Sequence, residues 1–244
     1  MNIKIENLIK CFGDKAAVDI SDFNINSGDI LGLVGNNGAG KTTLFRLLLD
    51  LLKADDGCVY MSPKSAEGVF GSINPAESEE WKAMTGAYID DGFLIDFLTS
   101  EEYFDFVGKV NSLSKQEIGE RLKLFDHFMN GEICGQKKLI RNFSAGNKQK
   151  VGIISAMLNN PKLLILDEPF NFLDPTSQNV LKHLLVEYNR RTGATILISS
   201  HNLNHTVDIS TRIALLEGGV IIKDLPNVNK SAEKELEEYF DKKF

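Results

Sequence analysis

The stretch Gly35-Asn36-Asn37-Gly38-Ala39-Gly40-Lys41-Thr42-Thr43 decides the fold of this chain. It follows an apolar run at residues 30–34, which predicts a buried strand, and leads into residues 44–49, which predict a helix. A strand, a glycine-rich loop and a helix in this order, with the pattern G-x-x-x-x-G-K-[ST], are typical of a phosphate-binding P-loop. The alternative, an ordinary glycine-rich turn, does not explain the lysine and two threonines that follow the last glycine.

The residues of this loop suit different parts of a nucleoside triphosphate. Gly38 and Gly40 permit positive φ and a close approach of the backbone to a ligand. The N–H groups of the loop then form an anion cradle at the positive end of a helix. Lys41 would reach the β- and γ-phosphates, and Thr42 would offer its hydroxyl to Mg²⁺. The expected nucleotide-binding residues of the loop are Asn37, Gly38, Ala39, Gly40, Lys41, Thr42 and Thr43.

The composition favours a folded protein of the cytoplasm. The chain has 244 residues, 43% of them hydrophobic, enough for one large domain. A net charge of -7 argues against nucleic-acid binding as the main purpose. Three widely spaced cysteines without a C-x-x-C pattern indicate reduced thiols. Because no apolar run approaches the roughly 18–20 residues that span a bilayer, any membrane part must come from another chain.

The overall pattern predicts an α/β fold. We expect a P-loop NTPase with a mixed or parallel sheet flanked by helices, an N-terminal antiparallel β portion and an inserted helical subdomain. Residues 1–8 and 17–26 predict antiparallel strands, and shorter strands are expected at 58–61 and 69–70. Towards the C-terminus the pattern predicts helices at 145–158 and 175–191, strands at 162–166 and 195–199, and a hairpin of residues 212–217 and 220–224.

The middle section, residues 74–143, has a helical texture. We expect one helix over 76–84, and two more after capping boxes that begin at Thr99 and Ser114. The prediction is therefore a domain over 1–225 with residues 74–143 inserted, followed by a short helical tail over 226–244. We interpret the charged helix at 231–242 as a solvated amphipathic end.

A second candidate site follows another apolar strand. Residues 163–166 are all apolar and lead into Asp167 and Glu168, which is the Walker B pattern. In P-loop enzymes such an aspartate lies at the carboxyl end of a strand and holds Mg²⁺. Glu168 projects differently and could act as general base towards a water molecule. The alternative is a solvated strand end that happens to carry two acids.

His201 follows the strand expected at 195–199. Its imidazole could hydrogen-bond the γ-phosphate or the attacking water. Taken alone, His201 could equally be a surface histidine at the start of a helix.

Together these motifs resemble the nucleotide-binding subunit of ATP-binding cassette (ABC) transporters. The resemblance rests on the P-loop, the signature-like segment 143–147, the Asp-Glu pair, Leu173-Asp174 and His201, and it extends to about residue 225. It implies ATP and Mg²⁺ as ligands and head-to-tail pairing with a second nucleotide-binding subunit. It also implies that Phe12 stacks on adenine, that Asp174 lies in the D-loop, and that the partner site receives Ser144, Ala145, Gly146 and Asn147.

The chain departs from this family in three places. The signature has Ala145 and Asn147 where the family usually has glycine and glutamine. Asp90 stands where the family has the glutamine of its Q-loop; a carboxylate is a good ligand for Mg²⁺, and this exchange resembles the bacitracin-export branch. Phe170 and Phe172 replace the usual threonine and glycine, and these rings could change how the D-loop packs.

The resemblance implies an ATPase whose dimer powers a membrane transporter through a transmembrane partner on another chain. The protein would then be peripheral to the inner face of the membrane. Tyr88, Phe93 and Phe97 are candidate contacts with that partner, with a purely structural role as the alternative. A soluble ABC-type ATPase acting on ribosomes or DNA is the competing hypothesis, but it usually requires two cassettes or basic extensions. A P-loop kinase would leave Ser144 and His201 without a role.

Overall fold

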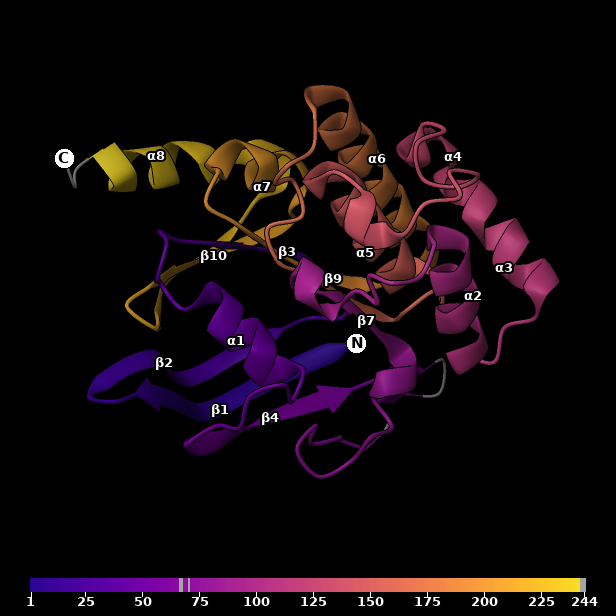
Figure 1. Cartoon of the computed structure of the whole chain (residues 1–244). Helices are drawn as coiled ribbons and strands as arrows, with labels where there is room; N and C mark the ends of the chain where they lie inside the picture. Colours follow the sequence, from indigo (N-terminus) through magenta and orange to yellow (C-terminus); the bar gives the residue numbers. More distant parts are fainter. Residues whose placement is uncertain (66–67, 70, 242–244) are drawn as a thin grey trace.

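The computed structural model describes residues 1–65, 68–69 and 71–241, arranged as two sheets with helices around them (Figure 1). The smaller sheet is antiparallel, with strand order β2-β1-β4, and it contains the expected N-terminal strands. Its inward side chains alternate with exposed ones, as in a sheet with one solvated face. The strands are β1 (Asn2–Phe12), β2 (Lys15–Ile25) and β4 (Asp56–Ser62).

The larger sheet has six strands in the order β11-β10-β3-β9-β8-β7. Neighbouring strands in this sheet are parallel, except for the antiparallel pair β10 and β11 at one edge. The mixed sheet of the predicted α/β fold is therefore confirmed. The central strands are buried on both faces, which explains their continuous apolar sequence. The strands are β3 (Ile30–Val34), β7 (Thr85–Tyr88), β8 (Leu163–Leu166), β9 (Thr195–Ser200), β10 (Arg212–Glu217) and β11 (Val220–Pro226).

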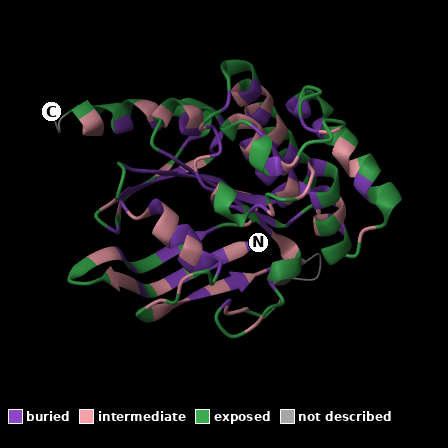
Figure 2. Ribbon diagram, viewed as in Figure 1, coloured by how far each residue is buried: buried purple, intermediate pink, exposed green. Residues whose placement is uncertain are grey.

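Helix α1 (Lys41–Leu48) packs between the two sheets. Its Leu44, Phe45 and Leu48 join one hydrophobic cluster with inward residues of both sheets. The opposite face of the large sheet is covered by α5 (Ala145–Met157) and α6 (Pro175–Thr192), whose apolar residues form a second cluster. Figure 2 shows the buried central strands enclosed between these layers. The P-loop is therefore held on a rigid, fully buried strand.

The prediction of a helix over residues 76–84 is wrong. The segment forms turns and one 3₁₀ turn, η1 (Lys82–Met84), before strand β7. Asn74 Oδ1 accepts a hydrogen bond from Ala76 N at 3.1 Å, and Ser78 Oγ accepts one from Glu80 N at 3.3 Å. Such local side-chain bonds favour turns over a helix.

The helical section begins beyond β7. Both expected capping boxes are confirmed, Thr99 with Glu102 and Ser114 with Glu117. The helices lie together at one side of the molecule (Figure 1), and their apolar residues join the cluster around α5. They are α2 (Ser100–Val110), α3 (Lys115–Leu122) and α4 (Asp126–Met129), with 3₁₀ turns η2 (Asp91–Phe93), η3 (Lys123–Phe125) and η4 (Ile140–Asn142).

The C-terminal helix is not a solvated end, contrary to our expectation. In α8 (Glu233–Asp241), Leu236 has no exposed surface, and it packs in a cluster with Val34, Val207 and Leu215. A 3₁₀ turn, η5 (Val228–Lys230), precedes it, and α7 (Leu203–Ile209) lies beside it. The cause is tertiary: α8 covers apolar surface that α7 and the large sheet leave open.

Two short strands, β5 (Lys64–Ser65) and β6 (Gly68–Val69), pair with each other. The expected strand at 69–70 and the last residue of the expected helix at 231–242 extend into Phe70 and Lys242, which lie outside the described residues. In the described part of the chain, no helix is both long and apolar enough to cross a membrane.

Candidate functional site

The P-loop backbone has the conformation that its glycines predict. Gly38 and Gly40 adopt φ of 79° and 110°, in the left-handed region. A Cβ atom at Gly40 would in addition overlap the carbonyl oxygen of Ala17 on β2. Glycine at position 40 is therefore required by the backbone conformation and by the close approach of the small sheet.

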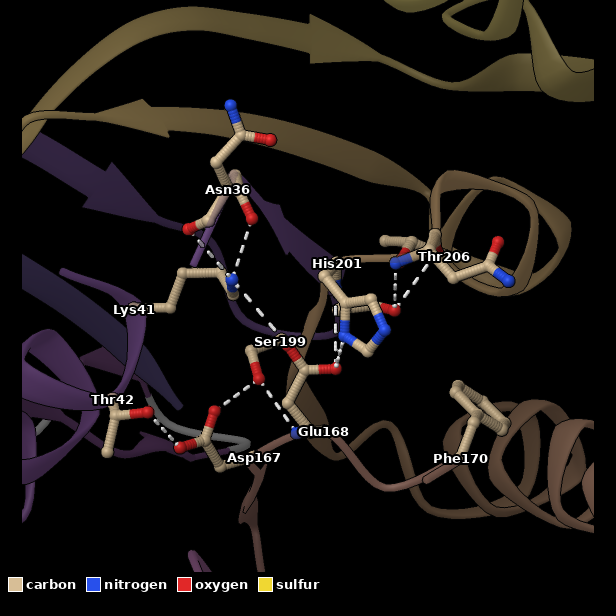
Figure 3. Close-up of polar contacts among 12 residues, drawn as sticks. Asn36, Lys41, Thr42, Asp167, Glu168, Phe170, Ser199, His201 and Thr206 are labelled. Atoms are coloured by element: carbon tan, nitrogen blue, oxygen red, sulfur yellow. Dashed lines mark hydrogen bonds and ion pairs between the residues drawn. The ribbon is translucent and has the colours of Figure 1, made fainter. Parts of the chain in front are cut away.

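The Lys41 side chain lies inside the loop (Figure 3). It is only 6% exposed, and its ammonium donates to Gly35 O at 2.7 Å and lies 3.5 Å from Glu168 Oε1. A buried cation needs such partners to offset its desolvation. The ammonium therefore stands between the loop and the acidic strand end, where anionic oxygens would meet it.

Thr42 and Asp167 are in direct contact. Thr42 Oγ1 donates to Asp167 Oδ2 at 2.5 Å, and the other carboxylate oxygen accepts from Ser199 on β9. Burial raises the pKa of Asp167, although both hydroxyl groups oppose that shift by stabilising the carboxylate. A hydroxyl and a carboxylate side by side form a pair of hard oxygen ligands that suits a divalent cation.

Glu168 and His201 form the second pair. The Nδ1 atom of His201 lies 2.9 Å from Glu168 Oε2, and the backbone N–H of His201 donates to the same oxygen at 3.3 Å. Glu168 has a φ of 46°, which turns its side chain away from that of Asp167. Its backbone is held by Ser199 Oγ and by Gln149 of α5. The acid thus occupies one defined position, with its carboxylate partly exposed towards the P-loop.

A cavity of about 350 Å³ extends from the P-loop and Glu168 to Phe12. Its lining includes the P-loop from Asn37 to Thr43, Glu168 and the half-exposed ring of Phe12. A flat aromatic face at the open end of an anion cradle suits a nucleobase attached to a triphosphate. Lys15, which the sequence reasoning did not single out, also lines this cavity.

Asp90 lies beside a different cavity, of about 230 Å³, whose lining also includes Asp167 and Glu168. Asp90 Oδ2 pairs with Arg46 at 3.2 Å, and its Oδ1 accepts from Gly92 N at 2.9 Å. The structure therefore brings the three candidate acids to one cavity wall, with Asp90 engaged by a cation of the chain itself.

The signature segment begins α5, and its Ala145 lines the 230 Å³ cavity together with Asp167 and Glu168. Ser144 caps α5 by accepting from Asn147 N at 3.2 Å, and both Ser144 and Ala145 are exposed. The described lining of the P-loop cavity includes none of the residues 144–147. A Cβ atom at Gly146 would lie 2.6 Å from Phe172 O, so the signature and the loop before α6 touch. Asp174 caps α6 through Thr176 N and Ser177 N.

Besides Lys15, two further residues of this site were missed from the sequence. Ser199 bridges Asp167 and Glu168, and Arg46 pairs with Asp90. Ser199 could have been found, since it is a polar residue at the carboxyl end of an otherwise apolar strand, where ligand-facing groups of parallel sheets gather. Arg46 gave no such signal, because its partner lies 44 residues away in sequence.

The fold and site together define an ATP-binding cassette. The family model described as "ABC transporter" matches residues 18–171, and one described as "AAA domain, putative AbiEii toxin, Type IV TA system" matches residues 135–208. A bacitracin transport ATP-binding protein, BcrA, of Bacillus licheniformis is 33% identical over 96% of this chain and 74% of that protein.

Solved structures of the same fold agree. One described as the ATP-binding subunit of an ABC transporter superimposes with a TM-score of 0.82 at 24% identity, covering 99% of both chains. The cassette MJ0796, in a dimeric post-hydrolysis state with ADP and Pi, has a TM-score of 0.79 at 22% identity, covering 93% of this chain and 99% of that one.

The chain belongs to the ABC transporter ATP-binding family. It is an ATPase subunit, and the ATP hydrolysis that it carries out powers a transporter.

Proposed function

We propose that the contacts from Lys41 through Glu168 to His201, together with Thr42 and Asp167, form one half of a Mg²⁺-dependent ATP-hydrolysing site. The carrying observation is that residues from three separate strand ends lie within hydrogen-bond or ion-pair distance of each other. Lys41 and the loop N–H groups would bind the phosphates, and Phe12 would contact the base.

The residues present fit a magnesium ion. Among the described residues no group of three or more His, Cys, Asp or Glu side chains could hold a metal alone. Thr42 Oγ1 and Asp167 Oδ2 lie 2.5 Å apart, and Mg²⁺ is usually bound through one or two carboxylates together with phosphate oxygens and water. Thr42 and Asp167 would hold the ion, and Asp90 is the additional candidate. When bound, the ion would neutralise charge on the phosphates.

Glu168 would take the proton of the attacking water. Its carboxylate is held by Lys41 and His201, so it is oriented without being closed off from the cavity. His201, half exposed, would hold Glu168 in this orientation and hydrogen-bond the reacting γ-phosphate or water.

The signature segment would complete the site of a second cassette. Ser144 and the N–H groups that follow it present the positive end of α5 at the surface, and Gly146 keeps that end close to the loop before Asp174. We infer a head-to-tail dimer, either of two copies or with a related chain, in which each P-loop receives segment 144–147 of its partner.

A transmembrane partner would dock in an apolar groove of about 300 Å³. It is lined by Leu49 and Leu51, which follow α1, by Trp81 and by Phe93, which is 52% exposed. Phe97 is 66% exposed and also remains a candidate contact, whereas Tyr88 is 4% exposed and packs against α5, so its expected role at the surface is wrong. The bacitracin transport relative and Asp90 favour a peptide or lipid as cargo, with the protein bound to the inner membrane face through this partner.

Replacing Glu168 by glutamine tests the proposal. E168Q should bind ATP normally, but its rate of ATP hydrolysis should fall about 10²- to 10⁴-fold, because glutamine is not a base. Its ATP-bound form should also accumulate as a dimer in size-exclusion chromatography. The matched control is E187Q, which alters an exposed acid that forms a surface ion pair with Arg190. Near-normal turnover of E168Q would remove Glu168 from the mechanism.

A further inference from the structure

Each carboxylate oxygen of Asp90 has one partner within the chain. Its Oδ1 accepts from Gly92 N at 2.9 Å, which caps the turn η2, and its Oδ2 pairs with Arg46 Nη2 at 3.2 Å. The first contact is local and survives any movement of Arg46. The second is the one that must open before Oδ2 can bind another cation.

Arg46 comes from α1, the helix that begins at Lys41. Its side chain and that of Asp90 are 43% and 44% exposed, so water and ions reach the pair. The Nε atom of Arg46 is buried without a hydrogen-bond partner among the described residues, so only the end of the guanidinium holds the acid. Half-exposed pairs of this kind are weak and can be exchanged by a competing ion.

Three of the four carboxylates that line the 230 Å³ cavity already have a cation nearby. Arg46 serves Asp90, Lys148 lies 3.5 Å from Asp91, and Lys41 lies 3.5 Å from Glu168. The fourth, Asp167, has the hydroxyl groups of Thr42 and Ser199 as its hydrogen-bond donors. A divalent cation that enters beside Asp167 therefore finds the neighbouring Asp90 neutralised by Arg46.

We propose that Arg46 is a positioning residue that competes with Mg²⁺ for the carboxylate of Asp90. This inference rests on the proposed Mg²⁺–ATP site. In the nucleotide-free cassette Arg46 neutralises Asp90 and fixes its orientation. When Mg²⁺ and the phosphates bind, Asp90 exchanges Arg46 for the metal, so the guanidinium sets how much Mg²⁺ the site requires.

The test is a Mg²⁺ titration of binding by a fluorescent ATP analogue, followed by anisotropy so that no turnover is needed. R46A should lower the Mg²⁺ concentration at half-maximal binding by about two- to fivefold, the range for loss of a half-exposed ion pair. R46K, which keeps the charge, should stay near the wild type. R190A, which removes another arginine–carboxylate pair on the surface, is the matched control and should change nothing.

A second variant shows whether the effect passes through Asp90. D90N should raise the Mg²⁺ requirement, and R46A added to D90N should produce no further change. A fall in the requirement in R46A/D90N would mean a general charge effect and would overturn the inference, as would an unchanged or raised requirement in R46A alone. Failure of the wild-type chain to bind the analogue at any Mg²⁺ concentration would instead contradict the proposed function.

Discussion

Replacement of Leu236 by alanine should destabilise the whole domain. Leu236 is fully buried, and it packs with Val34, Val207, Ile213 and Leu215. Leucine-to-alanine changes at such sites cost roughly 2–5 kcal/mol, because both transfer free energy and packing are lost. We expect about 3 kcal/mol at Leu236, since Val34, Ile213 and Leu215 belong to the central sheet and cannot move into the gap.

Urea unfolding followed by tryptophan fluorescence measures this loss. Trp81 is the single tryptophan of the chain, is 4% exposed and belongs to a different hydrophobic cluster, so its signal reports unfolding of the domain and not fraying of α8. V228A, at a side chain that is 70% exposed, is the control and should change stability by less than about 0.5 kcal/mol. If L236A also cost less than about 1 kcal/mol, α8 would not be part of the cooperative unit, and our description of its packing would be refuted.

Three further perturbations probe other parts of the chain. Gly152→Ala places a methyl group on the ring of Tyr88 and should cost about 1–3 kcal/mol in thermal or urea unfolding, whereas Gly119→Ala, with open space around it, should be neutral or slightly stabilising. Asp174→Ala should cost about 1 kcal/mol at pH 7, because an N-cap is lost. The pKa of Asp174 is lowered by its hydrogen bonds at the start of α6, so its contribution is present above the ordinary value of about 3.9 and is lost as pH falls through the lower folded value. The difference between wild type and D174A should therefore close in acid; a constant difference down to pH 2 would contradict the assignment. Burial raises the pKa of Cys134 to about 11, so its alkylation by iodoacetamide at pH 8, followed by mass spectrometry, should be much slower than that of a free cysteine, and equal rates would show that the thiol is exposed.

The parts of the site that could be predicted are those with a local chemical signal. The P-loop pattern, the apolar strand before Asp167 and the capping boxes each place residue types where the backbone itself requires them. Their convergence follows from the parallel sheet, because the carboxyl ends of β3, β8 and β9 meet at one edge. Once the strands are recognised, the proximity of Lys41, Glu168 and His201 is nearly determined.

The parts that failed depend on contacts between distant segments. Residues 76–84 have helical composition, but side-chain bonds from Asn74 and Ser78 turn the chain, and β7 must enter the large sheet directly afterwards. The sequence predicts a solvated tail because most residues of α8 are charged. The role of its few apolar residues becomes visible only with the apolar surface that they cover. The same holds for Tyr88, whose burial depends on a glycine of α5.

Phe170 and Phe172 stand where the family usually has threonine and glycine, and the two rings have different surroundings in the fold. Phe170 is 3% exposed, and its ring lies 4.9 Å from that of His205 on α7, four residues after His201. Burial and the nearby charge of Lys182 lower the pKa of His205, so this ring is neutral near pH 7 and suits an apolar stack. The larger side chain at position 170 therefore ties the loop after Glu168 to the helix that follows His201. Phe172, in contrast, is 73% exposed beside Gly146, so it is the aromatic that can alter contacts across a dimer.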